Sequence, residues 1–118
     1  MKHFTFEELE HSDIADALHI DNHANEKVRA NLRRLVDEVL DPARELLGMP
    51  ITVNSGFRCP SLNRAVGGAK RSYHLYGLAA DLNAGSSADN RRLLQILRTL
   101  PHTELIDEHS STWIHVAL

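Results

Sequence analysis

The sequence predicts a single α+β domain over residues 1–118, with helices first and a small antiparallel sheet after them. Two observations lead to this prediction. The N-terminal half holds a long segment of helical periodicity, Val28 to Leu47, whereas the C-terminal half holds short runs with β-branched residues. The last two runs, Glu104–His109 and Thr112–Leu118, alternate in polarity across a break and are typical of a hairpin. We expect the N-terminal helices to pack against this sheet.

The N-terminal elements are predicted from their caps and breakers. Thr5 and Glu8 have the spacing of a capping box, so a short helix should follow them. Ser12 is placed to start a second short helix. In the long helix Pro42 removes a backbone donor, which should kink or divide it, and Gly48 should end it.

The elements after the long helix are predicted to be short. Ile51–Val53 is β-branched and indicates a strand, and Pro60–Val66 indicates one helical turn. The mostly apolar run Leu78–Leu82 is suited to a buried strand. Ser86 opens another helix, which Pro101 closes.

Composition and charge exclude several classes of function. A net charge of −3 argues against a nucleic-acid-binding domain, in which basic residues should be in excess. No apolar run approaches the roughly 18 residues needed to cross a membrane. The single cysteine, Cys59, cannot form an internal disulfide. Glu7 and Glu8 stand where a signal peptide would need its apolar core, so we expect the chain to be cytoplasmic on synthesis.

Eight histidines are many for so short a chain, and most of them are expected to be solvated or locally hydrogen-bonded. This group is His3, His11, His19, His23 and His102. His74, Asp81 and His115 differ, because a carboxylate at Asp81, on an apolar strand, is costly unless paired or bound to metal. Two imidazoles and a carboxylate make a catalytic zinc site, but a buried His–Asp pair is also a common structural motif. The spacing alone does not bring His115 to the other two.

Three motifs of the chain resemble a known family. Ser72–Asp81, with the sequence SYHLYGLAAD, resembles the SxHxxGxAxD signature of zinc D-Ala-D-Ala carboxypeptidases and related peptidoglycan peptidases. Trp113–His115 is similar to their closing WxH element, and Ser55–Arg58 is similar to the SGYR segment that precedes the signature. Phe4–Glu8 and the long helix resemble compact, phage-type members. The resemblance covers nearly the whole chain.

The resemblance implies one zinc peptidase domain with the fold of Hedgehog and D,D-peptidases. It implies Zn²⁺ held by His74, Asp81 and His115, a ligand set that suits this metal. It places Arg58 at the cleft, where a guanidinium can hold a substrate carboxylate bidentately. Ser72 is expected to bind substrate or to orient His74.

The implied activity is hydrolysis of a peptidoglycan stem peptide or muropeptide by a metal-activated water. A D,D- or L,D-carboxypeptidase and an endolysin-type endopeptidase both agree with the motifs. The alternatives are a zinc-binding module without hydrolysis, as in the Hedgehog signalling domain, and a metal-free domain with a core His–Asp bond. We expect a monomer that does not insert into membranes, and release to the wall in the manner of a phage lysin would agree with the lack of a signal peptide.

The general base is the position at which the chain departs from the family. Family members often carry an acidic residue three positions before the last histidine, where this chain has Thr112. The candidates here are Glu108 and Asp107, and the register of the hairpin decides between them. A two-residue turn places Glu108 on the face of His115 as a diagonal neighbour.

The other register, with a three-residue loop, would bring Asp107 and His109 to that face instead. The apolar pattern favours the first register, because it points Asp107 away. We therefore predict Glu108 as the general base, with Asp107 in reserve. His109 is a candidate for supporting the site or the oxyanion.

Overall fold

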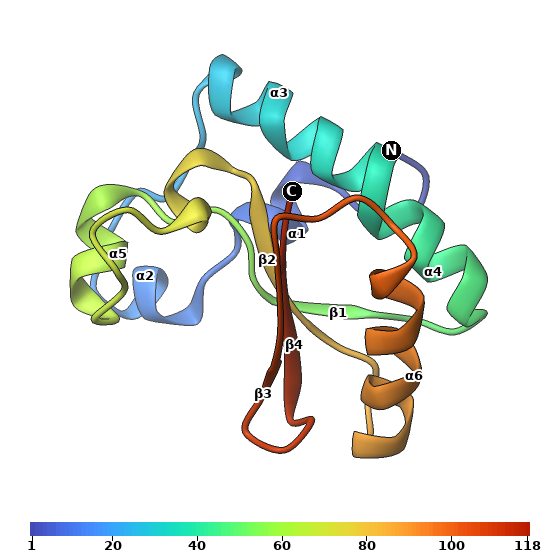
Figure 1. The fold of residues 1–118 in the computed structure, drawn as a ribbon. Coiled ribbons are helices and arrows are strands. Elements are labelled where there is room, and N and C mark those ends of the chain that lie inside the picture. The colour runs from blue at the N-terminus through green and yellow to red at the C-terminus, as the bar shows by residue number, and fades with distance from the viewer.

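The computed structural model describes residues 1–118 as helices packed on a four-stranded antiparallel sheet (Figure 1). The elements are α1 (Phe6–Glu10), α2 (Asp13–Ala17), α3 (Glu26–Leu35), the π-helical η1 (Val36–Leu40), α4 (Asp41–Leu47), β1 (Thr52–Ser55), α5 (Pro60–Ala65), the 3-10 helix η2 (Tyr73–Tyr76), β2 (Ala79–Asn83), α6 (Ser87–Arg98), β3 (Glu104–Glu108) and β4 (Trp113–Ala117). The strand order is β1-β2-β4-β3. This confirms the predicted α+β fold.

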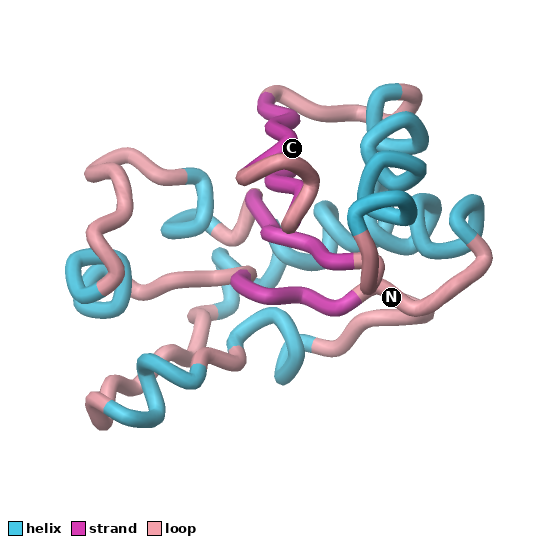
Figure 2. The backbone as a smooth tube through the Cα atoms, turned by 90° about the horizontal axis from the view of Figure 1, so that it is seen from below, coloured by secondary structure: helices cyan, strands magenta, loops and turns pink.

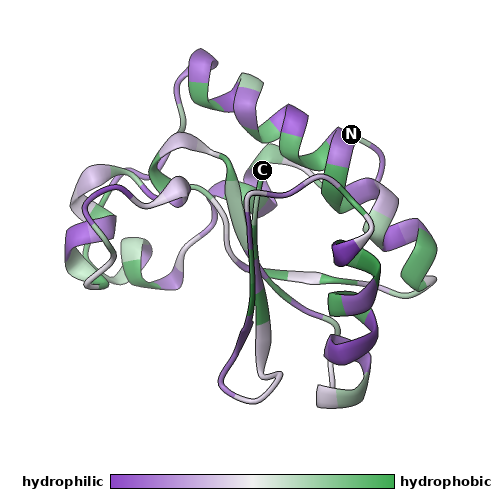
Figure 3. Cartoon of the chain, in the orientation of Figure 1, coloured by the Kyte–Doolittle hydropathy of each residue, from purple (hydrophilic) through white to green (hydrophobic).

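The sheet has one covered face and one open face. Seen from below, its strands lie in front of the long helical segment, with α6 at one side (Figure 2). Leu82 and Ile114 are fully buried in the core of 19 residues. Figure 3 shows green, apolar stretches alternating with purple, polar ones along α3 and α6. Because side chains alternate along a strand, Asp81 and His115 point to the opposite, open face. No helix is long and apolar enough to pass through a membrane.

The predicted N-terminal signals are confirmed with one shift of boundary. The hydroxyls of Thr5 and Ser12 accept hydrogen bonds at the starts of α1 and α2. The long helix begins earlier than predicted, at Glu26, because Asn25 caps it. The long helix is divided as expected. Its middle part, η1, is a π-helix with about one more residue per turn than an α-helix, and α4 follows with Pro42 in its first turn. Gly48, at φ 74°, ends it.

Two local predictions are wrong. β1 begins at Thr52 and continues to Ser55, because it is paired with β2 as far as Asp81. The hairpin turn has four residues, 109–112, between the strand ends, of which His109, Ser110 and Ser111 have positive φ. The strands nevertheless pair in the predicted register, with Ile106 opposite His115.

Hydrogen bonds join the N-terminal segment to the residues that follow β1. The backbone N–H of Phe57 donates to Leu9 O at 2.8 Å. The buried Asn22 side chain donates to Glu10 O at 2.8 Å and to Phe57 O at 2.9 Å, and it accepts from Cys59 N at 2.8 Å. A single amide therefore satisfies three backbone groups and holds α1 against the segment that follows β1.

Gly56→Ala is expected to lower the free energy of unfolding by about 2 kcal/mol, as is typical of overpacking. A Cβ on Gly56 would overlap the backbone of Leu9, which cannot turn aside as a side chain can. Urea unfolding followed by the fluorescence of Trp113, with EDTA present, measures the loss. Gly67→Asn is the control, because nothing lies within 4 Å of its added Cβ and asparagine tolerates its φ of 70°. Equal stabilities of the two variants would contradict the prediction.

Candidate metal centre

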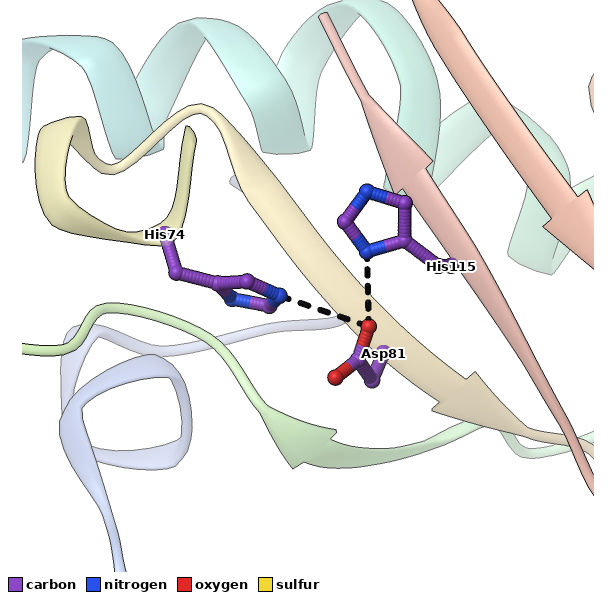
Figure 4. A group of neighbouring side chains, drawn as sticks. All are labelled: His74, Asp81 and His115. Carbon is purple, nitrogen blue, oxygen red and sulfur yellow. Dashed lines mark hydrogen bonds and ion pairs between the residues drawn. The ribbon is translucent and has the colours of Figure 1, made fainter. Parts of the chain in front are cut away.

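The fold brings His74, Asp81 and His115 together on the open face of the sheet (Figure 4). Asp81 on β2 and His115 on β4 are directly paired residues of adjacent strands. His74 comes from η2, whose first turn is capped by the Ser72 hydroxyl, and only 2% of its side chain is exposed. One ligand atom from each residue lies within 4.8 Å of the other two.

One carboxylate oxygen of Asp81 faces both imidazoles. Its Oδ1 lies 2.9 Å from His115 Nδ1 and 3.4 Å from His74 Nε2. Burial works to raise the pKa of Asp81, but hydrogen bonds from His115 and His74 outweigh it and hold that pKa well below its ordinary value. Burial likewise works to lower the pKa of His115, but its two carboxylate partners raise it. The centre therefore holds an ionised carboxylate between two basic nitrogens.

The hydrogen-bond partners of His74 fix its tautomer. Its Nδ1 lies 2.7 Å from Gly56 O, and a carbonyl can only accept, so Nδ1 carries the hydrogen. Nε2, which approaches Asp81 Oδ1, is then the nitrogen of His74 that is available to a metal. Two imidazole nitrogens and one carboxylate oxygen converging in this way are the donor set of three-ligand zinc sites, so the residues fit that metal.

Arg58 and Ser72 lie beside this centre and contact each other. Arg58 Nη2 donates to Ser72 Oγ at 3.3 Å, and the same oxygen accepts from His74 N at 3.2 Å. The Nε of Arg58 is buried without a hydrogen-bond partner. Burial lowers the pKa of the guanidinium, although the Asp81 carboxylate works to raise it. An anionic group of a ligand would satisfy this cation.

Two hollows border the centre. A cavity of about 300 Å³ is lined by Arg58, Ser72, His115 and Glu108, among others. A larger groove of about 660 Å³ runs along β1, and Arg58 and Asp81 line it as well. Both hollows therefore reach Asp81 and Arg58.

A family model described as Peptidase M15 matches residues 2–117. The chain belongs to the peptidase M15 family. It is similar to a zinc D-Ala-D-Ala carboxypeptidase of Streptomyces albus G, with 56% identity over 48 residues. That segment covers 40% of this chain and 19% of the relative, so the chain spans less than two thirds of that protein.

The hairpin residues predicted for the site, Glu108, Asp107 and His109, make different contacts in this M15 chain. Glu108 lines the cavity together with His115, in the register that the sequence favoured. Both carboxylate oxygens of Asp107 bind Ser111 instead, at 2.7 Å to its N and 2.9 Å to its Oγ. The ring of His109 packs on Trp113, with centroids 4.7 Å apart, and His109 does not line the cavity.

Sequence reasoning missed Glu104, which is a second carboxylate, besides Asp81, that touches His115. Its Oε1 lies 2.9 Å from His115 Nε2. The available signal was the alternation of β3: Glu104 and Glu108 flank Ile106, which is paired with His115, so both are its diagonal neighbours.

The remaining histidines of the M15 chain mostly make local contacts. His23 pairs with Asp21 at 2.6 Å, and His102 Nδ1 lies 2.7 Å from Leu100 O. His11, Asp13 and Asp16 also lie within 4.8 Å of one another, but all three are exposed. Such exposed groups are common without a bound ion.

Proposed function

We propose that this M15 chain is a zinc-dependent peptidase that hydrolyses peptide bonds in peptidoglycan stem peptides. The observation that carries the proposal is the convergence of His74, Asp81 and His115 at a cavity that Glu108 and Arg58 also line. The similarity to a protein named zinc D-Ala-D-Ala carboxypeptidase supports both the metal and the class of substrate.

His74, Asp81 and His115 would hold the metal. When bound, zinc supplies a Lewis acid that polarises a carbonyl and lowers the pKa of a bound water to about 7. The protein contributes fixed ligands: Gly56 O holds the tautomer of His74, and strand pairing holds Asp81 beside His115. A single carboxylate among the three ligands would leave one unit of the two positive charges of zinc uncompensated, which favours Lewis-acid chemistry.

Glu108 is the proposed general base. It accepts the proton of the attacking water and passes it to the leaving amine. Its position supports this role, because it lines the cavity with the proposed ligands, whereas Asp107 is occupied by Ser111.

Arg58 is proposed to bind a carboxylate of the substrate. Arg58→Ala is expected to raise KM about 10- to 100-fold, since a hydrogen bond to a charged group contributes about 1.5–3 kcal/mol. Arg58→Lys should recover little, because an ammonium cannot form the bidentate contact. Steady-state kinetics on a defined stem peptide measure both values. Arg64→Ala is the control, because Arg64 contacts only Ser61 on the exposed side of α5. An unchanged KM in Arg58→Ala would contradict the proposal that Arg58 binds a substrate carboxylate.

Digestion of purified peptidoglycan tests the function as a whole. The zinc-loaded protein should release or trim stem peptides, and a chelator should stop it, with the products identified by mass spectrometry. The masses show which bond is cut and whether cleavage is terminal or internal. Zinc at one equivalent with muropeptides of unchanged mass would overturn the peptidase proposal and favour a non-hydrolytic zinc module.

A further inference from the structure

We infer that Glu104 positions His115 for metal binding, by accepting the hydrogen of its Nε2 and so leaving Nδ1 free for the metal. The inference rests on the proposed zinc site and assigns a residue outside its ligands and general base. Glu104 is a positioning residue, because it touches His115 and acts through that ring.

The geometry comes from the pairing of the last two strands. β3 and β4 pair Glu104 with Ala117 and Ile106 with His115, so Glu104 reaches the imidazole along the diagonal. His115 is held between two carboxylates, at 2.9 Å from Asp81 on its Nδ1 side and 2.9 Å from Glu104 on its Nε2 side. The imidazole is 12% exposed and the Glu104 side chain 41%. The ring orientation is therefore fixed at both ends.

The chemistry follows from the hydrogen count of imidazole. A neutral ring carries one N–H, and a metal ligand needs a lone pair on the nitrogen that faces the metal. The nitrogen of His115 on the side of Asp81 and His74 is Nδ1, so when Nδ1 binds the metal the one hydrogen of the neutral ring must be on Nε2. An ionised Glu104 accepts that hydrogen and cannot donate one, which selects this tautomer. In His74 the two nitrogens are exchanged: Gly56 O accepts the hydrogen of Nδ1, so Nε2 is the nitrogen left for the metal.

The role of Glu104 is distinct from that of Glu108. Glu104 contacts the nitrogen of His115 that faces away from Asp81, so it lies on the far side of the ring from the proposed metal position. Both residues line the cavity, but Glu108 has no hydrogen bond to the ring, whereas Glu104 does. Loss of Glu104 should therefore weaken metal binding, and loss of Glu108 should not.

Zinc affinity, measured by competition with a chromophoric chelator, tests the inference without any substrate. Glu104→Ala should bind zinc about 10- to 100-fold more weakly, as is usual when the carboxylate partner of a ligating histidine is removed. Glu104→Gln should recover most of that loss, because its amide oxygen accepts the same hydrogen. Glu108→Gln is the control and should match the parent. An affinity of Glu104→Ala within twofold of the parent would overturn the inference.

A second measurement needs no variant. Long-range ¹H–¹⁵N correlations of the histidine rings in the zinc-loaded parent should show His115 with its hydrogen on Nε2, and a hydrogen on Nδ1 would overturn the inference. Failure of the proposed function gives a different result. In that case the zinc affinities would still differ between the Glu104 variants, while peptidoglycan would stay uncut.

Discussion

Replacing His74 by alanine is expected to give a protein that purifies without zinc and has lost at least about 10³-fold in peptidase activity. The physical reason is that a bound metal contributes several kcal/mol of transition-state stabilisation, and two protein ligands hold it poorly. Metal analysis of the purified protein and its rate on peptidoglycan measure the two effects. A zinc content equal to that of the parent would contradict the proposed ligand set.

The His74 variant needs two controls. His74 is buried and bonded to Gly56 O, so its loss also disturbs packing. Asp81→Asn keeps the shape of the site while removing its charge, and it should lose zinc with circular dichroism like that of the parent. His11→Ala tests the exposed group of His11, Asp13 and Asp16, and it should keep one equivalent of zinc.

Replacing Glu108 by alanine is expected to leave zinc bound and to lower kcat by about 10²- to 10⁴-fold, the usual contribution of a general base. Glu108 contacts none of the three proposed ligands through a hydrogen bond, so the metal site should stay intact. Single-turnover rates on a defined stem peptide, with zinc content measured in the same sample, separate the two properties. Cleavage at the parent rate would mean that another group takes the proton.

Asp107→Asn is the matched variant for this experiment. Because both of its carboxylate oxygens bind Ser111 in the hairpin turn, Asp107→Asn should lower stability and leave kcat within a few-fold of the parent. If Asp107→Asn lost turnover while Glu108→Ala kept it, the assignment would have to be reversed.

The sequence predicts those parts of the fold that depend on short-range rules. The cap at Thr5 and the stop at Gly48 are set by their own residues and near neighbours, and both are found. The pairing of Ile106 with His115 is also found, because a shift of one residue would turn a whole apolar face to solvent. The turn has four residues where two were predicted, and the register is nevertheless the predicted one.

Other features depend on contacts between distant residues. Positive φ at His109, Ser110 and Ser111 is not a preference of these residue types, and Asp107 helps to hold the turn through Ser111. The contact of Glu104 with His115 depends on the orientation of an imidazole ring, which alternation does not specify. The sequence also suggested the three converging side chains, which the structure brings together, while their role as ligands stays a prediction.

The segment that leaves β1 joins two parts of the molecule that are far apart in sequence. Gly56 O faces His74 Nδ1, while its neighbour Phe57 is bonded through N–H to Leu9 and through its carbonyl to Asn22. Docking of α1 and the orientation of His74 therefore depend on the same stretch of backbone. A change in the docking of α1 would therefore shift a backbone carbonyl that orients one of the proposed metal ligands.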